Sequence, residues 1–281
     1  MDLAGARVVV TGASTGIGRS TALLLADDGA RVLAVARDGD RLRDLAAAHP
    51  AIEVLRADLT RDADRTAVVE AAGEIDVLVN NAGIGWKGLV EEMPPDDVRA
   101  LIDLNVVALI DLTQRVLPSM LARRRGHIVN VGSVAGFVGV PGETVYCATK
   151  FAVQGFTDGL RRELRGRGVD VTLIAPGPIK TEFFARAVTG APASEPGALD
   201  RGLPPDAVAK AIRRALTRRL PGYRTITVPR VLGISRLGSM PLLARLTDLA
   251  TAKRAREGRR RDVLAAVDVT KDPSAADASV E

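Results

Sequence analysis

Short apolar runs alternate with amphipathic segments along most of this chain, and this alternation limits its possible folds more than any other feature. The apolar runs have the length of buried strands: residues 7–10, 31–36, 52–55, 75–80, 127–131, 169–174 and 225–228. The segments between them carry apolar positions three and four residues apart, as helices do: residues 19–28, 41–48, 61–72, 95–123, 144–166 and 205–219. Strands that are apolar on both faces must be covered on both sides. We therefore expect an α/β fold, a doubly wound parallel sheet of about seven strands with helices on both faces.

Two stretches interrupt the alternation and set the expected domain limits. Residues 182–204, between the last two predicted strands, are rich in Gly and Pro and predict a substrate lid, with a plain linker as the alternative. After residue 230, we expect an apolar and basic helical extension over residues 231–261 and a disordered tail over residues 262–281. Residues 1–230, with the lid, then form one domain.

The net charge of +5 does not indicate a nucleic-acid-binding face. Residues 253–261 hold six basic side chains and one acidic side chain, and the other 272 residues contain 33 of each sign. The basic excess is therefore one local cluster, and no nucleic-acid partner is expected. With 47% hydrophobic and 26% charged residues, the 281-residue chain has the composition of a globular protein rather than of a disordered one.

A single cysteine limits the covalent and metal chemistry of the chain. Cys147 cannot form an intrachain disulfide, and with only His49 and His127 no thiolate zinc cluster can be assembled, so no metal site is expected. We interpret all three side chains as structural. The sequence has no apolar run of about 18 residues that could span a bilayer, and it begins without a signal-peptide pattern, which predicts a cytoplasmic location.

The first predicted strand runs into a glycine-rich turn, T-G-A-S-T-G-I-G at residues 11–18, and a helix follows. Glycine permits a sharp turn and a close approach of backbone to ligand, and the amino end of a helix attracts negative charge. A turn at this place in a doubly wound fold is where the pyrophosphate of a dinucleotide binds. A merely tight turn is the alternative for this motif taken alone.

Several motifs, in order along the chain, resemble those of the short-chain dehydrogenase/reductase family. Residues 11–18 match the family's T-G-x-x-x-G-x-G pattern at every fixed position. Between residues 5 and 230 the resemblance continues with N-N-A-G at 80–83, Asn105, Ser133, Y-C-A-T-K at 146–150 and P-G-P-I-K-T at 176–181. The resemblance implies a Rossmann-like fold and an enzyme that transfers hydride between a nicotinamide cofactor and a carbonyl or secondary alcohol.

Tyr146 and Lys150 indicate the chemistry most directly. At positions i and i+4 of one predicted helix, their side chains share a face. A nearby ammonium favours the ionised phenol, so we expect Lys150 to bring the pKa of Tyr146 from about 10 towards neutrality, where it can donate and accept a proton. A surface tyrosine with a lysine one turn later is the alternative for the pair alone.

Two further residues complete the predicted catalytic set. Ser133 ends a predicted strand at the carboxyl edge of the sheet, where its hydroxyl can bond the reacting oxygen. The family resemblance implies that Lys150 also holds the nicotinamide ribose and that Asn105 fixes a water linking Lys150 to solvent. The alternatives are a strand-end serine without a role and a hydrogen-bonded core amide at Asn105.

The resemblance also implies most of the cofactor-binding set. Asp58 is expected to contact the adenine, although a turn or cap role would also suit it, and Asn80 is expected to border the adenosine site while bracing adjacent strands. Ile179 and Thr181 match positions that hold the nicotinamide carboxamide. The predicted cofactor-binding residues are Gly12, Ser14, Thr15, Gly16, Ile17, Gly18, Arg37, Asp58, Leu59, Asn81, Ala82, Gly83, Tyr146, Lys150, Pro176, Gly177, Ile179 and Thr181.

The end of the second predicted strand bears on the choice between NADP and NAD. Sites for NAD generally place an acid there to accept from the ribose 2′-hydroxyl, whereas an arginine accommodates a 2′-phosphate. Ala36 stands where the acid would be expected, and Arg37 follows it. We therefore predict NADP, with NAD possible because Asp38 is adjacent.

These observations predict an NADP(H)-preferring oxidoreductase for a small-molecule carbonyl or alcohol, with Tyr146 as acid and base. The apolar lid and C-terminal stretch favour a hydrophobic or lipid-like substrate, with a 3-oxoacyl thioester as the alternative. A non-catalytic dinucleotide-binding sensor or scaffold is the alternative of another class. The resemblance also implies a homodimer or homotetramer.

Residues 241–251 have an amphipathic helical pattern and lead into the basic cluster at 253–261. Such a helix is expected to cover the substrate pocket or a subunit interface. The alternative is a peripheral anchor, whose apolar face would enter a membrane surface while the basic cluster meets anionic lipid.

Overall fold

The structure, a computed structural model, describes residues 1–181, 183, 202–217, 225–230 and 232. Within these residues seven parallel strands form one sheet, in the order β3-β2-β1-β4-β5-β6-β7. The strands are β1 (Arg7–Thr11), β2 (Arg31–Ala36), β3 (Ile52–Arg56), β4 (Val77–Asn80), β5 (Gly126–Val131), β6 (Val169–Pro176) and β7 (Thr225–Val228). The predicted doubly wound sheet is confirmed, and its strand order reverses between β1 and β4.

Alternate residues of the central strands enter two separate hydrophobic cores. In β1, Val8 and Val10 pack into one core and Val9 into the other, and all three are completely buried. A strand with one face in water would need a polar residue at every second position. The run of valines is therefore explained by the cover on both faces of the sheet.

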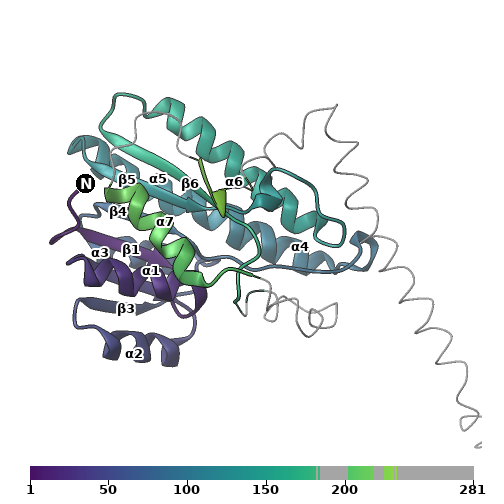
Figure 1. Ribbon diagram of the computed structural model, residues 1–281, viewed down its shortest axis with the longest axis horizontal. Coiled ribbons are helices and arrows are strands. Elements are labelled where there is room, and N and C mark those ends of the chain that lie inside the picture. Colours follow the sequence, from purple (N-terminus) through teal and green to yellow (C-terminus); the bar gives the residue numbers. More distant parts are fainter. Residues whose placement is uncertain (182, 184–201, 218–224, 231, 233–281) are drawn as a thin grey trace, which may run out of the picture.

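Helices form a layer on each face of this sheet (Figure 1). One layer contains α1 (Gly16–Asp27), α2 (Gly39–Ala48) and α7 (Pro205–Thr217). The opposite layer contains α3 (Asp62–Ala72), α5 (Ala108–Ala122) and α6 (Thr144–Glu163). Although α1 and α7 are far apart in the sequence, they lie side by side. Because the strands are all parallel, their carboxyl ends lie at one edge of the sheet, where ligands bind in such folds.

The single helix predicted over residues 95–123 is wrong in its middle. The structure instead has α4 (Pro95–Ile102), a π-helical turn at Asp103–Val107, and then α5. Asn105 lies in this turn, and its side-chain amide donates to the carbonyl oxygen of Ile84 at 2.9 Å and accepts from the backbone N–H of Ile84 at 2.8 Å. The contact joins the helix to a loop 21 residues earlier. Hydrophobic periodicity could not predict it, because periodicity reports only which face of a helix is buried.

Parts of the predicted lid and C-terminal extension lie outside the described residues. Of residues 182–204 only 183 and 202–204 are described, and of residues 231–261 only Leu232 is. The predicted tail, residues 262–281, is wholly outside them. Among the described helices, none combines the length and the apolar character needed to cross a membrane.

Candidate active site

The glycine-rich turn between β1 and α1 leaves no space for side chains at two of its positions. Gly12 has a φ of +65°, a left-handed conformation that favours glycine. A Cβ on Gly18 would lie 2.2 Å from the carbonyl oxygen of Gly12, so a larger residue would force the turn and the helix apart. The predicted residues Ser14, Thr15 and Ile17 lie on this turn and at the start of α1. The tight turn and the free N–H groups of the helix start fit a pyrophosphate.

The chain after β4 is hydrogen-bonded to this turn. The Thr11 hydroxyl accepts from the backbone N–H groups of Asn81 and Ala82, at 2.9 and 3.0 Å. The Asn81 amide donates to the carbonyl oxygens of Thr11 and Gly12, at 2.9 and 3.2 Å. The predicted cofactor residues Asn81 and Ala82 therefore brace the glycine-rich turn from the neighbouring strand.

Asn80, the last residue of β4, links two strands and two helices. Its Nδ2 donates to Asn130 Oδ1 on β5 at 2.9 Å and to Thr113 Oγ1 on α5 at 3.1 Å. Asn130 in turn donates to Thr157 Oγ1 on α6 at 2.9 Å. All four side chains are buried, where a hydrogen bond left unmade would be costly. The network holds α5 and α6 in position against the ends of β4 and β5.

Just after β2, Arg37 is exposed, whereas the neighbouring Asp38 is hydrogen-bonded. Ala36 is buried and Arg37 is exposed. Asp38 caps α2, because one carboxylate oxygen accepts from the backbone N–H of Arg41 at 3.1 Å and the other lies 3.4 Å from Arg41 Nε. Asp38 is therefore already bonded at the start of α2, while Arg37 is exposed.

Asp58 is a hydrogen-bonded carboxylate just beyond β3. Its Oδ1 accepts from the backbone N–H of Thr60 at 3.1 Å and from the Thr60 hydroxyl at 2.8 Å. Burial raises its pKa, but the hydrogen bonds from Thr60 and the charges of Arg37 and Arg61 outweigh burial, so the pKa is lowered overall. Asp58 makes the turn contacts considered as its alternative role, and it is ionised at neutral pH. The adjacent Leu59 is buried.

Three of the four catalytic candidates meet at the carboxyl end of β5. The Tyr146 hydroxyl shares a hydrogen bond with the side chain of Ser133. Ser133 Oγ also accepts from the backbone N–H of Ala135 at 3.1 Å, which orients the serine. On the same helix as Tyr146, Lys150 places its ammonium 5.6 Å from the centre of the tyrosine ring. This ammonium donates to the carbonyl oxygen of Val131 at 3.2 Å.

Asn105 approaches the same group from the π-helical turn. Besides its bonds to Ile84, its Nδ2 donates to Thr149 Oγ1 at 3.1 Å. A Cβ on Gly83 would lie 3.0 Å from Asn105 Oδ1 and 3.7 Å from Lys150 Nζ. The structure thus brings all four predicted catalytic residues together, and it gives Asn105 the hydrogen-bonded amide considered as the alternative.

The chain after β6 lies beside the glycine-rich turn. β6 ends at Pro176, and Ile179 then pairs with Leu203 in an isolated parallel bridge. A Cβ on Gly16 would lie 3.0 Å from Thr181 Cγ2, so Thr181 packs directly on the turn. Of the predicted residues between 176 and 181, Thr181 is therefore the one that lies against the predicted pyrophosphate site.

This arrangement coincides with a match to a known family. The family model for short chain dehydrogenases matches residues 6–191, which include the glycine-rich turn, all four catalytic candidates and Thr181. The chain belongs to the short-chain dehydrogenase/reductase family. It is accordingly an oxidoreductase that uses a nicotinamide dinucleotide.

Relatives and solved structures of short-chain dehydrogenases/reductases agree with this assignment. An uncharacterised oxidoreductase of Staphylococcus saprophyticus is 37% identical over 218 residues, which cover 74% of this chain and 89% of the relative. The closed form of serine dehydrogenase, complexed with NADP+, has a TM-score of 0.72 and 32% identity and covers 78% of this chain and 92% of its own. A 3-ketoacyl-(acyl-carrier-protein) reductase of Brucella melitensis, complexed with NADH, has a TM-score of 0.73 and 28% identity and covers 81% and 99%. The similar structures thus include complexes with both cofactors, in agreement with NADP as the predicted cofactor and NAD as a possible one.

Burial sets the protonation states in the active site of this short-chain dehydrogenase/reductase. Burial raises the pKa of Tyr146 above its ordinary value of 10.0, and the hydrogen bond with Ser133 offsets only part of this effect. Burial also lowers the pKa of Lys150 from 10.5 to about 8. The expectation that Lys150 draws the pKa of Tyr146 towards neutrality is wrong for this structure, because desolvation raises this pKa and outweighs the hydrogen bond with Ser133, which lowers it. Tyr146 therefore carries its proton at neutral pH and is set to donate it.

Tyr146 belongs to a hydrophobic cluster at the site. The buried members of this cluster are Trp86, Met93, Leu101, Ala135, Tyr146 and Cys147. The ring of Phe183 packs edge-on against the ring of Tyr146, with 5.8 Å between centroids and 61° between planes. The surroundings of the Tyr146 ring are thus mainly apolar.

Cys147 and the two histidines make structural contacts, as interpreted from the sequence. Cys147 is buried in the hydrophobic cluster. The buried His127 is hydrogen-bonded to Thr172 across β5 and β6 at 2.9 Å. The His49 ring accepts from the backbone N–H of Ala51 at 3.1 Å.

Three residues contribute to the site although the sequence predicts no role for them: Thr11, Thr149 and Phe183. A threonine at the end of an apolar strand could have indicated Thr11, because such a residue needs a hydrogen-bond partner when buried. Thr149 and Phe183 carry no comparable signal. Each contacts a residue from a different segment, and only the folded chain brings those segments together.

Proposed function

We propose that this protein is an NADP(H)-preferring reductase for the carbonyl group of a hydrophobic or lipid-like substrate, and that it oxidises the corresponding alcohol in reverse. The observation that carries the proposal is the buried Tyr146, protonated and hydrogen-bonded to Ser133 at the carboxyl end of β5. When bound, the nicotinamide supplies or accepts the hydride. Tyr146 donates the proton that the carbonyl oxygen requires, and the Ser133 hydroxyl stabilises the charge that develops on that oxygen.

Lys150 and Asn105 support this proton transfer. With a pKa of about 8, Lys150 is largely an ammonium at pH 7, and its charge stabilises the tyrosinate left after donation. Lys150 also holds the nicotinamide ribose in the proposed complex. Asn105 fixes a water through which Lys150 exchanges protons with solvent, a role that suits its position against Gly83 and Lys150.

The proposed cofactor contacts follow the edge of the sheet. The glycine-rich turn holds the pyrophosphate, Asp58 contacts the adenine, and Ile179 and Thr181 hold the nicotinamide carboxamide. The preference for NADP is supported by the exposed Arg37 and by the engagement of Asp38 in the cap of α2. The preference for an apolar substrate is supported by the hydrophobic cluster around Tyr146.

Two other functions are tested by the same experiment. Similarity to the 3-ketoacyl-(acyl-carrier-protein) reductase of Brucella melitensis favours a 3-oxoacyl thioester as the second substrate class. A dinucleotide-binding sensor or scaffold would bind the cofactor without turnover.

The test is oxidation of NADPH with a panel of hydrophobic aldehydes, ketosteroids and 3-oxoacyl thioesters, with Tyr146→Phe as the inactive control. Turnover of the first two groups that is lost in Tyr146→Phe is the expected result. Turnover of the 3-oxoacyl thioesters alone would show that these thioesters, and not the other hydrophobic carbonyl compounds, are the substrate class. Tight NADPH binding with no turnover of any substrate would contradict the proposed enzymatic function and favour a dinucleotide-binding sensor or scaffold.

A further inference from the structure

Two loops are joined to each other beside the hydrophobic cluster of the active site. One loop follows β4 and carries Trp86, Lys87 and Gly88, and the other precedes α6 and carries Gly142 and Glu143. The backbone N–H of Gly88 donates to the carbonyl oxygen of Gly142 at 2.9 Å. Lys87 Nζ lies 3.9 Å from Glu143 Oε1. Because Trp86 is a buried member of the cluster, this ion pair lies next to the cluster in the chain.

Glu143 is held one turn before the reacting tyrosine. Its carbonyl oxygen accepts from the backbone N–H of Cys147 at 2.8 Å, and Tyr146 lies within this first turn of α6. Its own backbone N–H donates to the carbonyl oxygen of Val140, which packs against the cluster, at 3.0 Å. The carboxylate makes no capping hydrogen bond to α6. The helix therefore does not need this side chain for its cap.

The charge of Glu143 reaches the reacting hydroxyl. It raises the pKa of Tyr146, as a negative charge does when it opposes formation of a tyrosinate nearby. The side chain of Glu143 is 17% exposed and that of Lys87 is 34% exposed. Water screens an ion pair with an exposed partner, so such pairs are weak. Lys87 therefore compensates the charge of Glu143 only in part.

We infer that Glu143 is a specificity-determining residue, whose charge disfavours substrates with a carboxylate beside the reacting carbonyl and so selects ketones and aldehydes that are uncharged there. In the proposed reaction Tyr146 donates to the carbonyl oxygen, so a carboxylate on the neighbouring carbon would lie near the same hydroxyl. Like charges brought together in a partly dehydrated site repel each other. The inference rests on the proposed function and narrows its substrate class.

The experiment compares two matched pairs of substrates with the full chain and NADPH. The pairs are 2-oxo-2-phenylacetate with its methyl ester, and 2-oxooctanoate with its methyl ester. The quantity measured is kcat/KM for the acid divided by kcat/KM for the ester. The intrinsic reactivity of each compound is the same with every variant, so it cancels when variants are compared with wild type. A change in the acidity of Tyr146 affects both members of a pair and cancels to first order.

The variants are Glu143→Gln, which removes the charge and keeps the size, and Lys87→Met, which removes the partial compensation. Glu163→Gln is the matched control, because it causes the same change in net charge at the exposed far end of α6. At 1.5 Å per residue, Glu163 lies about 30 Å along the helix from Glu143. Thermal unfolding of each variant shows whether it is folded.

Glu143→Gln is expected to raise the acid-to-ester ratio by about 10-fold, the order of magnitude for one unit charge acting over several ångströms. Lys87→Met should lower the ratio, and Glu163→Gln should leave it within about twofold of wild type. Should Glu143→Gln fail to fold, Lys87→Met tests the same charge from the opposite side, and an unchanged or higher ratio would overturn the inference.

Failure of the inference differs from failure of the proposed function. If the wild-type protein reduces neither the esters nor any compound of the carbonyl panel, the proposed function fails and the inference fails with it. If the wild-type protein reduces uncharged carbonyl compounds but uses the acids as well as the esters, the inference alone is overturned. An acid that Glu143→Gln uses no better than wild type does would overturn it too.

Discussion

Replacing the buried Lys150 with methionine should stabilise the protein at neutral pH, although it removes a group proposed to serve catalysis. The side chain is only 5% exposed, and burial lowers its pKa from 10.5 to about 8. At about 1.4 kcal/mol per pH unit, keeping this ammonium charged in the folded state at pH 7 costs about 3 kcal/mol. Methionine has a similar length and no charge. It loses the hydrogen bond from Nζ to Val131, worth about 1 to 2 kcal/mol, so the net gain is about 1 to 2 kcal/mol.

The pH dependence of the stability difference shows whether the buried charge of Lys150 is its cause. Between pH 8 and 10.5 the folded wild-type protein has lost the Lys150 proton while the unfolded chain still binds it, so wild-type stability rises with pH in this window. Below pH 8 the cost is present in full, and above pH 10.5 it is absent. The advantage of Lys150→Met should therefore shrink from pH 8 upwards and reverse near pH 10.5, where only the lost hydrogen bond counts. Tyr146 is present in both proteins, so its own titration cancels to first order in the difference.

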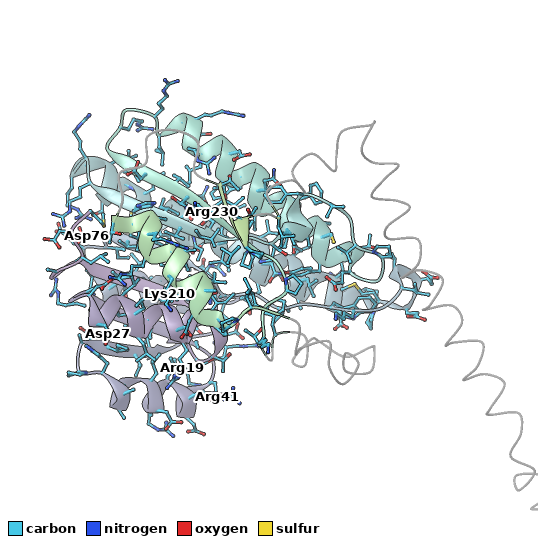
Figure 2. All side chains as sticks on the ribbon, in the orientation of Figure 1. Arg19, Asp27, Arg41, Asp76, Lys210 and Arg230 are labelled. Atoms are coloured by element: carbon cyan, nitrogen blue, oxygen red, sulfur yellow. The ribbon has the colours of Figure 1, made fainter. Side chains whose placement is uncertain are left out.

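Urea denaturation without nucleotide measures the free energy of unfolding of the wild-type protein and of Lys150→Met, each at pH 7 and at pH 10.5. Lys210→Met is the matched control, because Lys210 is an exposed lysine on α7 (Figure 2). Lys210→Met should change the free energy of unfolding by no more than about 0.5 kcal/mol at both pH values. A Lys150→Met protein that is less stable than wild type at pH 7, or a difference that does not change with pH, would refute the reasoning.

Four other outcomes are expected. Tyr146→Phe should lower turnover by about 10²- to 10⁴-fold with nucleotide binding nearly unchanged, and retention of a tenth of wild-type turnover would contradict the assignment. Arg37→Ala should weaken NADPH about 10- to 150-fold and NADH far less in a fluorescence titration; equal weakening of both would favour Asp38. Light scattering at micromolar concentration should give a homodimer or homotetramer, and a 29.6 kDa monomer would refute it. If the basic cluster is a membrane anchor, the protein should sediment with anionic vesicles at low salt, and removal of residues 253–281 should abolish this sedimentation. A protein that does not sediment, or that sediments equally well without residues 253–281, would leave the helix a role at the substrate pocket or a subunit interface.

The sequence determined the architecture and the place of the site, because both follow from local patterns. Continuous valine runs such as 8–10 can be satisfied only in a strand covered on both faces, and the structure buries them in two cores. The glycine-rich turn could be located for a similar reason, since its tight geometry excludes side chains at Gly12 and Gly18. The spacing of Tyr146 and Lys150 placed both on one helix face in advance.

The electrostatics of these same residues, in contrast, depend on how the whole chain packs around them. The pKa of Tyr146 rises where the sequence predicted a fall, because desolvation is caused by everything packed around it, including Trp86 and Phe183 from other segments. The hydrogen bonds of the Asn105 side chain likewise require Ile84, which lies in a separate loop. Apolar periodicity and glycine geometry are properties of neighbouring residues and can be read from the chain. Burial and hydrogen-bond partners depend on residues far away in sequence, so they exist only once the chain is folded.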